Sequence, residues 1–383
     1  MRRIAIVGGG QSGLQLALGL QQKQYEVTVV SNRTPEQIRG GRVTSSQFMF
    51  HDSLQSERDL GINFWEKECP ITEGIAFAIP GPDGSRALFW EARLDHYGQS
   101  VDQRVKFSGW MEEFQKRGGT LVIHDAGAGD LEEYAGGHDL VVVAAGKGEI
   151  ARLFERDPDR SPFSQPMRAL ALTYVKNMAP RTPYTAVAFN LIPQVGEYFV
   201  FPALTLSGRC EIMVFEGVVG GPMDCWQDVK TPQQHLERSK EILQRWLPWE
   251  AARCRDIELT DENGILAGRF APTVRKPVCK LPSGRVVLGM ADVVVLNDPI
   301  TGQGSNTAAK CATVYLERIL ERGSAPFDAA WMQETFDAFW EYAQWVAAWT
   351  NSLLTPPAPQ VLQLMGAASQ IPALAGKIAN SFN

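Results

Sequence analysis

The sequence has few of the residues on which most hydrolytic and metal-dependent chemistry is built. Its 383 residues include only six cysteines and five histidines. The cysteines form no CxxC pair and the histidines fall singly, so no metal-ligand spacing is present and we expect no metal site. The motifs HExxH, GxSxG and GxxxxGK followed by Ser or Thr are also missing. Their absence argues against hydrolase and phosphoryl-transfer chemistry.

The chain also lacks long apolar runs and clusters of basic residues. No stretch approaches the roughly 18–20 apolar residues of a membrane helix. The formal net charge is −6 and no basic patch stands out, which argues against nucleic acid as a partner. A strand is predicted from Arg3 onward, which leaves no room for a signal peptide before it. We therefore expect a cytoplasmic protein with reduced cysteines that binds neither membranes nor nucleic acid.

A glycine-rich turn near the N-terminus is the most informative feature that is present. The apolar run Arg3–Val7 leads into Gly-Gly-Gly-Gln-Ser-Gly, helical spacing of apolar residues follows, and a second strand is predicted at Glu26–Val30. A strand, a GxGxxG turn and a helix form a dinucleotide cradle, in which the helix N-terminus faces the phosphates. The residues expected to contact the dinucleotide here are Gly8, Gly10, Gln11, Ser12 and Gly13.

The end of the second strand carries no acidic residue. An NAD site usually has Asp or Glu there to hold the ribose hydroxyls, whereas this chain has Ser31, Asn32 and Arg33. These side chains can still hydrogen-bond an adenosine, but they hold it less tightly. A plain NAD-dependent dehydrogenase is therefore disfavoured.

Two further apolar strands are predicted to end in glycine. Asp139–Ala145 leads into Gly146-Lys147-Gly148, which is either a bend beneath the first cofactor or a degenerate second nucleotide motif. Arg285–Leu288 leads into Gly-Met-Ala-Asp and a second glycine-rich turn, with a helix expected at about Thr307–Glu321. Ends of parallel strands gather at one sheet edge, where ligands bind. The strand-rich block from about residue 169 to 220 predicts a separate antiparallel sheet.

The glycine-rich region that follows the predicted strand Arg285–Leu288 resembles that of flavoprotein monooxygenases in the aromatic-hydroxylase superfamily. In that superfamily an aspartate after the strand binds the ribityl chain, and the glycine-rich helix N-terminus lies at the pyrimidine edge of the flavin. A helix N-terminus stabilises the negative charge of a reduced flavin at that edge. The resemblance assigns to the FAD site Arg42, Asp292, Pro299, Gly302, Gln303, Gly304 and Asn306.

A narrower resemblance covers most of the chain. The sequence is similar to the oxygenase component of two-component styrene and indole monooxygenases in the stretches IAIVGGGQSGL, SNRTPE, GGRVTSSQFM, QSVDQR, VVVAAGKGEIARLFERD, SPFSQPMRAL, EYFVFPAL and NDPITGQGSN. The resemblance implies that the protein binds no pyridine nucleotide. A separate NADH-dependent reductase would supply reduced FAD as a diffusible co-substrate. With O2 this would give a flavin 4a-hydroperoxide that epoxidises an electron-rich double bond of a small aromatic substrate.

The loop after Arg42 indicates which branch of that family the chain is similar to. Ser45, Gln47, Met49 and Ile75 match the indole-preferring branch and are the expected substrate-binding residues, with Ser45 also expected to stabilise the peroxide. Because side chains alternate along an extended segment, the first three share one face. Thr72 and Gly98 depart from the branch pattern, in which an apolar residue and alanine stand. Epoxidation of the indole 2,3 bond would give indoxyl and then indigo.

Two further features of the sequence concern the C-terminal aromatic residues and His51. The aromatic residues of the C-terminal segment recur at mixed helical spacing, which is more typical of helix packing than of a cofactor site. His51 follows the predicted substrate loop, and strand alternation would point it inward with Met49.

The expected fold is α/β: a Rossmann-like FAD-binding domain with an inserted, mainly antiparallel substrate domain and C-terminal helices. The FAD-binding domain comprises residues 1–44, 96–165 and 280–325, and the substrate domain residues 45–95 and 166–279. Residues 326–383 form the helical segment. Three alternatives stay open: a single-component NAD(P)H-dependent aromatic hydroxylase, a styrene-preferring epoxidase, and a flavin-binding protein without turnover.

Overall fold

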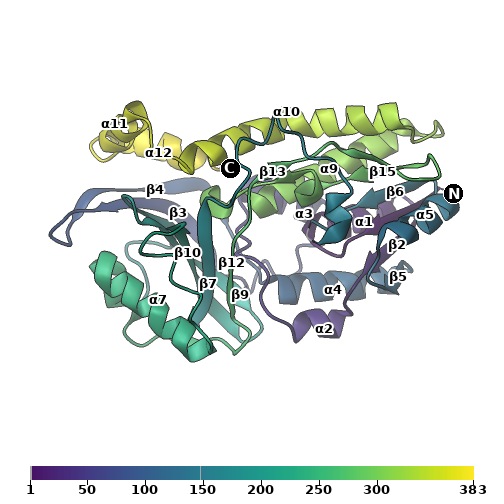
Figure 1. Cartoon of the computed structure of the whole chain (residues 1–383). Helices are drawn as coiled ribbons and strands as arrows, with labels where there is room; N and C mark the ends of the chain where they lie inside the picture. The colour runs from purple at the N-terminus through teal and green to yellow at the C-terminus, as the bar shows by residue number, and fades with distance from the viewer. Residues whose placement is uncertain (1, 147) are drawn as a thin grey trace.

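The computed structural model describes residues 2–146 and 148–383, so Lys147 of the second glycine bend lies outside the described residues. Within the described residues, the strands form a six-stranded sheet, an eight-stranded sheet and a small two-stranded ribbon. Figure 1 shows the two larger sheets side by side, with the C-terminal helices running over both. This arrangement agrees with the predicted α/β fold.

The six-stranded sheet contains the strands that were predicted to end in glycine. Its order is β14 (Val278–Lys280), β15 (Val286–Gly289), β6 (Leu140–Val143), β1 (Arg3–Val7), β2 (Glu26–Ser31) and β5 (Thr120–Ile123). All neighbours pair in parallel except β14, which pairs antiparallel with β15. Every residue of β6 is buried, as a strand covered on both faces requires. The carboxyl ends of β15, β6, β1 and β2 therefore meet at one edge of the sheet.

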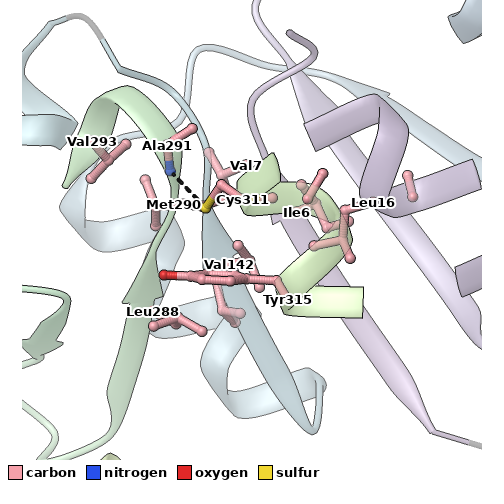
Figure 2. Close-up of a cluster of buried hydrophobic side chains, with 14 of the residues drawn as sticks. Ile6, Val7, Leu16, Val142, Leu288, Met290, Ala291, Val293, Cys311 and Tyr315 are labelled. Carbon is pink, nitrogen blue, oxygen red and sulfur yellow. Dashed lines mark hydrogen bonds between the residues drawn. The ribbon is translucent and has the colours of Figure 1, made fainter. Parts of the chain in front are cut away.

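Helices cover both faces of the six-stranded sheet. They include α1 (Gln11–Gln22), α2 (Pro35–Arg39), α4 (Gln103–Lys116), α5 (Ala128–Gly137) and α9 (Gly304–Arg322). Figure 2 shows Cys311 and Tyr315 of α9 packed against the strand residues Val142 and Leu288. The Tyr315 hydroxyl donates to the carbonyl oxygen of Gly289 at 2.8 Å. These contacts fix α9 relative to the strand ends.

The eight-stranded sheet is mainly antiparallel, as the strand-rich block predicted. Its order is β11 (Glu258–Leu259), β7 (Arg168–Lys176), β10 (Gly208–Val218), β9 (Gly196–Thr205), β8 (Ala186–Ile192), β3 (Thr72–Pro80) and β4 (Arg86–Gly98), with β12 (Ile265–Gly268) also paired to β7. A hairpin turn around residues 81–85 joins β3 to β4, which pair antiparallel. The parallel pairing of β3 with β8 joins this hairpin to the later strands.

Helix α7 (Pro232–Trp246) packs on one face of the eight-stranded sheet, and the opposite face looks toward the segment before α3 (His51–Asp59) (Figure 1). Helix α3 ends at Asp59, and Gly61 follows its C-cap with a left-handed φ of +61°. The remaining short elements are α6 (Glu149–Arg152), α8 (Pro248–Ala251), β13 (Thr273–Val274), β16 (Val295–Leu296) and three 3₁₀ turns, η1 (Ala252–Cys254), η2 (Ala291–Val293) and η3 (Pro299–Thr301).

The C-terminal segment forms α10 (Ala329–Leu353), α11 (Pro359–Ala368) and α12 (Pro372–Asn380). Phe336 and Phe339 of α10 are fully buried in the core of the six-stranded sheet, which confirms the packing interpretation of these aromatics. Trp345 is 72% exposed. None of the helices in the described part of the chain combines the length and hydrophobicity that crossing a bilayer needs.

Candidate functional site

The turn between β1 and α1 has a geometry that only glycine allows at two positions. Gly8 has a φ of +132°, and a Cβ on Gly13 would lie 2.1 Å from the carbonyl oxygen of Gly8. At Gly10, by contrast, an added Cβ would meet no atom within 4 Å. Helix α1 begins there without a side-chain cap. Open space beside an uncapped helix N-terminus is what a pyrophosphate group requires.

The second and third glycine bends lie beside the first. A Cβ on Gly8 would lie 2.6 Å from the carbonyl carbon of Ala144, and one on Gly146 would lie 2.3 Å from the Cβ of Asp292. The Met290 N–H also donates to the carbonyl oxygen of Val143 at 2.9 Å. The structure thus brings Asp292 next to the strand end that borders the GxGxxG turn.

The residues expected around the adenosine are spread over the end of β2 and the following loop. Ser31 is buried, and its hydroxyl donates to the carbonyl oxygen of Arg33 at 2.9 Å. The Ser31 Oγ would be 3.3 Å from a Cβ on Gly9, so this turn adjoins the glycine motif. Asn32 and Arg42 are exposed.

Gln11 and Ser12 are both buried at the start of α1. The Gln11 amide donates to Glu57 at 3.0 Å and to Gln15 at 3.1 Å. Glu57 in turn forms a buried ion pair with Lys106 at 2.7 Å. The side chain of Gln11 therefore belongs to an internal polar network, and its backbone remains at the glycine turn.

The turn before α9 has the other geometry expected of a flavin site. It consists of η3 followed by Gly302, whose φ of +66° is left-handed, and α9 begins without a side-chain cap. Asn306 in the first turn of α9 accepts from the N–H of Phe50 at 2.9 Å and donates to the carbonyl oxygen of Phe48 at 3.0 Å. This side chain therefore ties the predicted substrate loop to the glycine-rich helix N-terminus.

A cavity lies between this turn and the eight-stranded sheet. Its lining residues are Ser46, Phe48, Phe50, Val187, Phe189, Phe199, Phe201, Val214, Pro299, Thr301 and Gly302. Its volume of about 20 Å³ gives room for roughly one water molecule. An aromatic ring can therefore enter only if phenylalanine side chains move.

The cavity lies on the opposite face of the loop from the predicted substrate residues. Gln47 is buried, and its amide donates to the Tyr174 hydroxyl at 3.1 Å. The sulfur of Met49 lies 3.1 Å from the Nζ of buried Lys106. The Ser45 carbonyl oxygen accepts from the Tyr174 hydroxyl at 2.7 Å. Side chains alternate along the loop as predicted, but the cavity is lined by the other set, Ser46, Phe48 and Phe50.

Two more positions from the sequence pattern lie around the same loop. Ile75 is fully buried in an apolar cluster with Phe48 and Phe50. A Cβ on Gly98 would lie 2.4 Å from the Cζ of Phe48, so the departure from alanine at this position leaves room for that ring. Thr72 is fully buried at the start of β3.

The expectation that His51 points inward with Met49 was wrong. Helix α3 begins at His51, so strand alternation no longer applies there. The imidazole instead stacks on that of His96, with ring centroids 4.0 Å apart and an interplanar angle of 19°. His51 does not line the cavity.

The phenylalanines that line the cavity were missed in the sequence. Phe48 and Phe50 occupy alternate positions of the loop, and Phe199 and Phe201 occupy alternate positions of β9. Each pattern puts two rings on one face, but only the packing of the loop against the sheet shows that these faces meet.

Comparison with known proteins gives one family match to part of the chain and relatives that match its whole length. A family model described as the putative substrate binding domain of styrene monooxygenase A matches residues 146–253. The chain is similar to styrene monooxygenase along its whole length. Styrene monooxygenase StyA of Pseudomonas fluorescens is 29% identical over 391 aligned positions, covering 100% of this chain and 93% of the relative. StyA of a further Pseudomonas species gives the same identity and coverage.

Solved structures of flavin-dependent proteins share the fold. The flavin-dependent brominase Bmp2 aligns over 98% of this chain and 92% of its own, with a TM-score of 0.69 and 13% identity. PqsL of Pseudomonas aeruginosa, described as a probable FAD-dependent monooxygenase, aligns over 96% of this chain and 99% of its own, with a TM-score of 0.69 and 14% identity. These likenesses confirm the predicted fold class. Together with the similarity to StyA, they support a flavin-dependent monooxygenase.

Proposed function

We propose that this chain is the oxygenase component of a two-component FAD-dependent monooxygenase. It would take reduced FAD from a separate NADH-dependent reductase, together with O2, and epoxidise the 2,3 double bond of indole and the double bond of styrene-type alkenes. The observation that carries the proposal is that three glycine bends meet at one sheet edge, and that a phenylalanine-lined cavity opens beside the third.

The residues at this edge suit FAD in kind and position. The turn at Gly8–Gly13 would hold the pyrophosphate, and Ser31–Arg33 the adenosine. Asp292 would contact the ribityl chain, and the turn from Pro299 to Asn306 the pyrimidine edge. We also assign Arg42 to the flavin side of the loop. Bound reduced FAD would supply the electrons that activate O2. The lack of an acidic ribose ligand fits a flavin that must enter and leave.

The side chains of the chain itself would act by enclosure and orientation. Phe48, Phe189, Phe199 and Phe201 present ring carbons to the cavity, which suits a flat apolar substrate and keeps water from the reacting atoms. Ser45 and the backbone near Gly302–Gly304 would hydrogen-bond the oxygen-bearing edge of the flavin and delay the loss of hydrogen peroxide. This chemistry calls for no general base or nucleophile from the protein.

Indole preference rests on Ser45, Gln47, Met49 and Ile75. Gln47 and Met49 do not line the cavity, so we propose that they act on substrate size through Tyr174 and Lys106, which they contact behind the loop. Styrene preference is the second candidate, because the full-length relatives are named styrene monooxygenases. We further propose a cytoplasmic location, and keep the expected domains at residues 1–44, 96–165 and 280–325 for FAD, 45–95 and 166–279 for substrate, and 326–383 for the helical segment.

The test combines the purified chain with FAD, NADH, an unrelated flavin reductase, oxygen and indole. Blue indigo should form only when all components are present, and styrene in place of indole should give styrene oxide. NAD(P)H oxidation by the chain without reductase would instead show a single-component hydroxylase. Failure to form any product from chemically reduced FAD, despite FAD binding, would show a flavin-binding protein without turnover.

A further inference from the structure

Four charged residues are buried together beside the cavity, where the eight-stranded sheet meets the turn before α9. Arg168 comes from β7, Glu197 from β9, Glu216 from β10 and Asp298 from the residue before η3. All four are at most 6% exposed, and Glu216 is fully buried.

The sheet register places this cluster next to the cavity. Glu216 pairs with Glu197 across the antiparallel strands β10 and β9, and Val214, two residues before Glu216, pairs with Phe199, two residues after Glu197. Because residues two apart share a face of a strand, both glutamates lie on the face that carries the cavity-lining side chains. On the turn side, Asp298 directly precedes Pro299, another cavity residue.

Arg168, the only cation among these four residues, is ion-paired with Glu197. The Arg168 Nε and Nη2 donate to the two carboxylate oxygens of Glu197 at 2.7 and 3.0 Å. Its Nη1 donates to the carbonyl oxygens of Met167 and Leu354 at 3.1 and 3.2 Å. The second Nη2 hydrogen is directed to the carbonyl oxygen of Leu353 at 3.3 Å, so every guanidinium N–H has a partner other than Glu216.

Glu216 and Asp298 are left facing each other. Their carboxyl groups are in hydrogen-bond contact. Among the described residues, neither carboxyl oxygen of Glu216 nor the Oδ2 of Asp298 receives a hydrogen bond from a donor group. Two carboxylates in contact in the protein interior cannot both be ionised, so one proton must lie between them.

The surroundings decide which residue carries the proton. The Oδ1 of Asp298 accepts from the Ile300 N–H at 3.1 Å, which favours the ionised form of Asp298. In the part of the chain that the structure describes, Glu216 has no such donor. Burial raises its pKa well above the ordinary value, and the neighbouring charges of Asp298 and Glu197 raise it further, against a smaller opposing effect of Arg168.

We propose that Glu216 is a neutral carboxylic acid that positions the flavin-binding turn, its O–H donating to Asp298 and Asp298 in turn holding Ile300. The proposal rests on the proposed function, because the turn that it holds is the one assigned to the pyrimidine edge of FAD. Glu216 acts through Asp298 and is thus a positioning residue.

Neutrality matters at this place because of the charge of the expected ligand. A reduced flavin carries negative charge near its pyrimidine edge, where the N-terminus of α9 would stabilise it. An ionised Glu216 would add a second buried negative charge beside Asp298, which would repel both the turn and the flavin. A protonated Glu216 links β10 to the turn without that charge. The hydroxyl contact between Thr301 and Thr350, at 2.9 Å, holds the turn from α10.

Two substitutions separate the proposed hydrogen bond from simple space filling. Glu216→Gln is neutral at every pH and keeps an N–H donor for Asp298, whereas Glu216→Leu is neutral and of similar size but has no donor. We expect the FAD dissociation constant of Glu216→Gln to stay within about threefold of wild type. That of Glu216→Leu should rise at least about tenfold, because the buried Asp298 oxygen loses its partner. Thermal unfolding of each variant checks that it is folded.

The protonation state is measured directly by infrared spectroscopy of the flavin-free full-length chain at pH 7. Wild type should show the C=O stretch of a buried protonated carboxyl group, and Glu216→Gln should lack it. Absence of this difference would overturn the proposal, as would equal FAD affinity of the Gln and Leu variants. If wild type bound no FAD, the proposed function would fail, and with it the positioning role. The infrared difference would still decide whether Glu216 is neutral.

Discussion

The two large sheets bring different kinds of atoms to the site. The six-stranded sheet contributes backbone: its strands end in turns where Gly8 and Gly13 leave no space for a side chain and Gly10 leaves space for a ligand. The eight-stranded sheet contributes side chains, and the cavity wall on this side consists of rings and aliphatic groups such as Phe199, Phe201 and Val214. The turn before α9 is where these two surfaces meet.

This difference has a physical reason. A pyrophosphate is recognised by N–H groups and a helix dipole, which are the same in every sequence once the turn can form. An apolar substrate is recognised by the shape of a cavity, which depends on the identity and direction of each side chain. The cofactor side of the site should therefore be sensitive to a single added methyl group in a turn. The substrate side should respond to substitutions that change which side chains face the cavity.

The largest effect is expected from Gly13→Ala. The new Cβ would lie 2.1 Å from the Gly8 carbonyl oxygen, so backbone must move, and we expect a loss of about 3 kcal/mol in the free energy of unfolding. Denaturant unfolding measures this loss. The matched control is Gly10→Ala, whose Cβ meets no atom within 4 Å. Its stability should stay within about 1 kcal/mol of wild type. Its FAD affinity should fall about tenfold, because the methyl group takes the place of the pyrophosphate.

Equal stability of the two alanine variants would contradict this account of the turn. Wild-type FAD affinity in Gly10→Ala would move the pyrophosphate away from the GxGxxG motif. Either result would contradict the view that backbone atoms form the cofactor side of the site and side chains form the substrate side.

The cofactor side of the site, which backbone atoms form, is also the side that the sequence predicts well. The strands β1, β2 and β6 occur close to their predicted bounds, because apolar runs that stop at glycine have few alternative structures. Local signals sufficed where the local chain determines the conformation.

A second prediction concerns the far face of the eight-stranded sheet, where His235 of α7 is buried. Desolvation lowers the pKa of His235 from 6.5 to about 4. The unfolded chain therefore binds this proton as the pH falls below 6.5, while the folded chain does not until about pH 4. We expect wild type to lose about 2 kcal/mol of stability through this residue between pH 7 and pH 5.

Urea unfolding at both pH values measures the loss, and His235→Phe should reduce it by that amount. His124, which is exposed and contacts Asp130, provides the control His124→Gln, which should leave the acid sensitivity unchanged. An equal loss in wild type and His235→Phe would show that acid acts elsewhere in the molecule.

The substrate side of the site, which side chains form, cannot be predicted from the sequence in the same way. Alternation along residues 45–50 is visible in the sequence, but nothing local tells which of the two faces meets the sheet. The answer depends on contacts far away in the chain, such as Asn306 with Phe48 and Phe50, and Tyr174 with Ser45 and Gln47. The buried contact of Glu216 with Asp298 is likewise invisible until β10 and the turn are brought together.

The smallest expected effect tests the two faces of this loop directly. Ser46 lines the cavity, whereas Ser45 lies on the other set of alternating positions and is our proposed partner of the oxygen-bearing flavin edge. Ser46→Val should raise KM for indole by about threefold, under 1 kcal/mol, because it fills part of the cavity, and should leave peroxide release unchanged. Ser45→Ala should increase hydrogen peroxide release per NADH by a similar factor and leave KM unchanged. Steady-state assays of indigo and peroxide separate the two effects. If Ser45→Ala altered only KM, Ser45 would face the substrate instead of the flavin. The assignment of one face of the loop to the substrate and the other to the flavin would then be wrong.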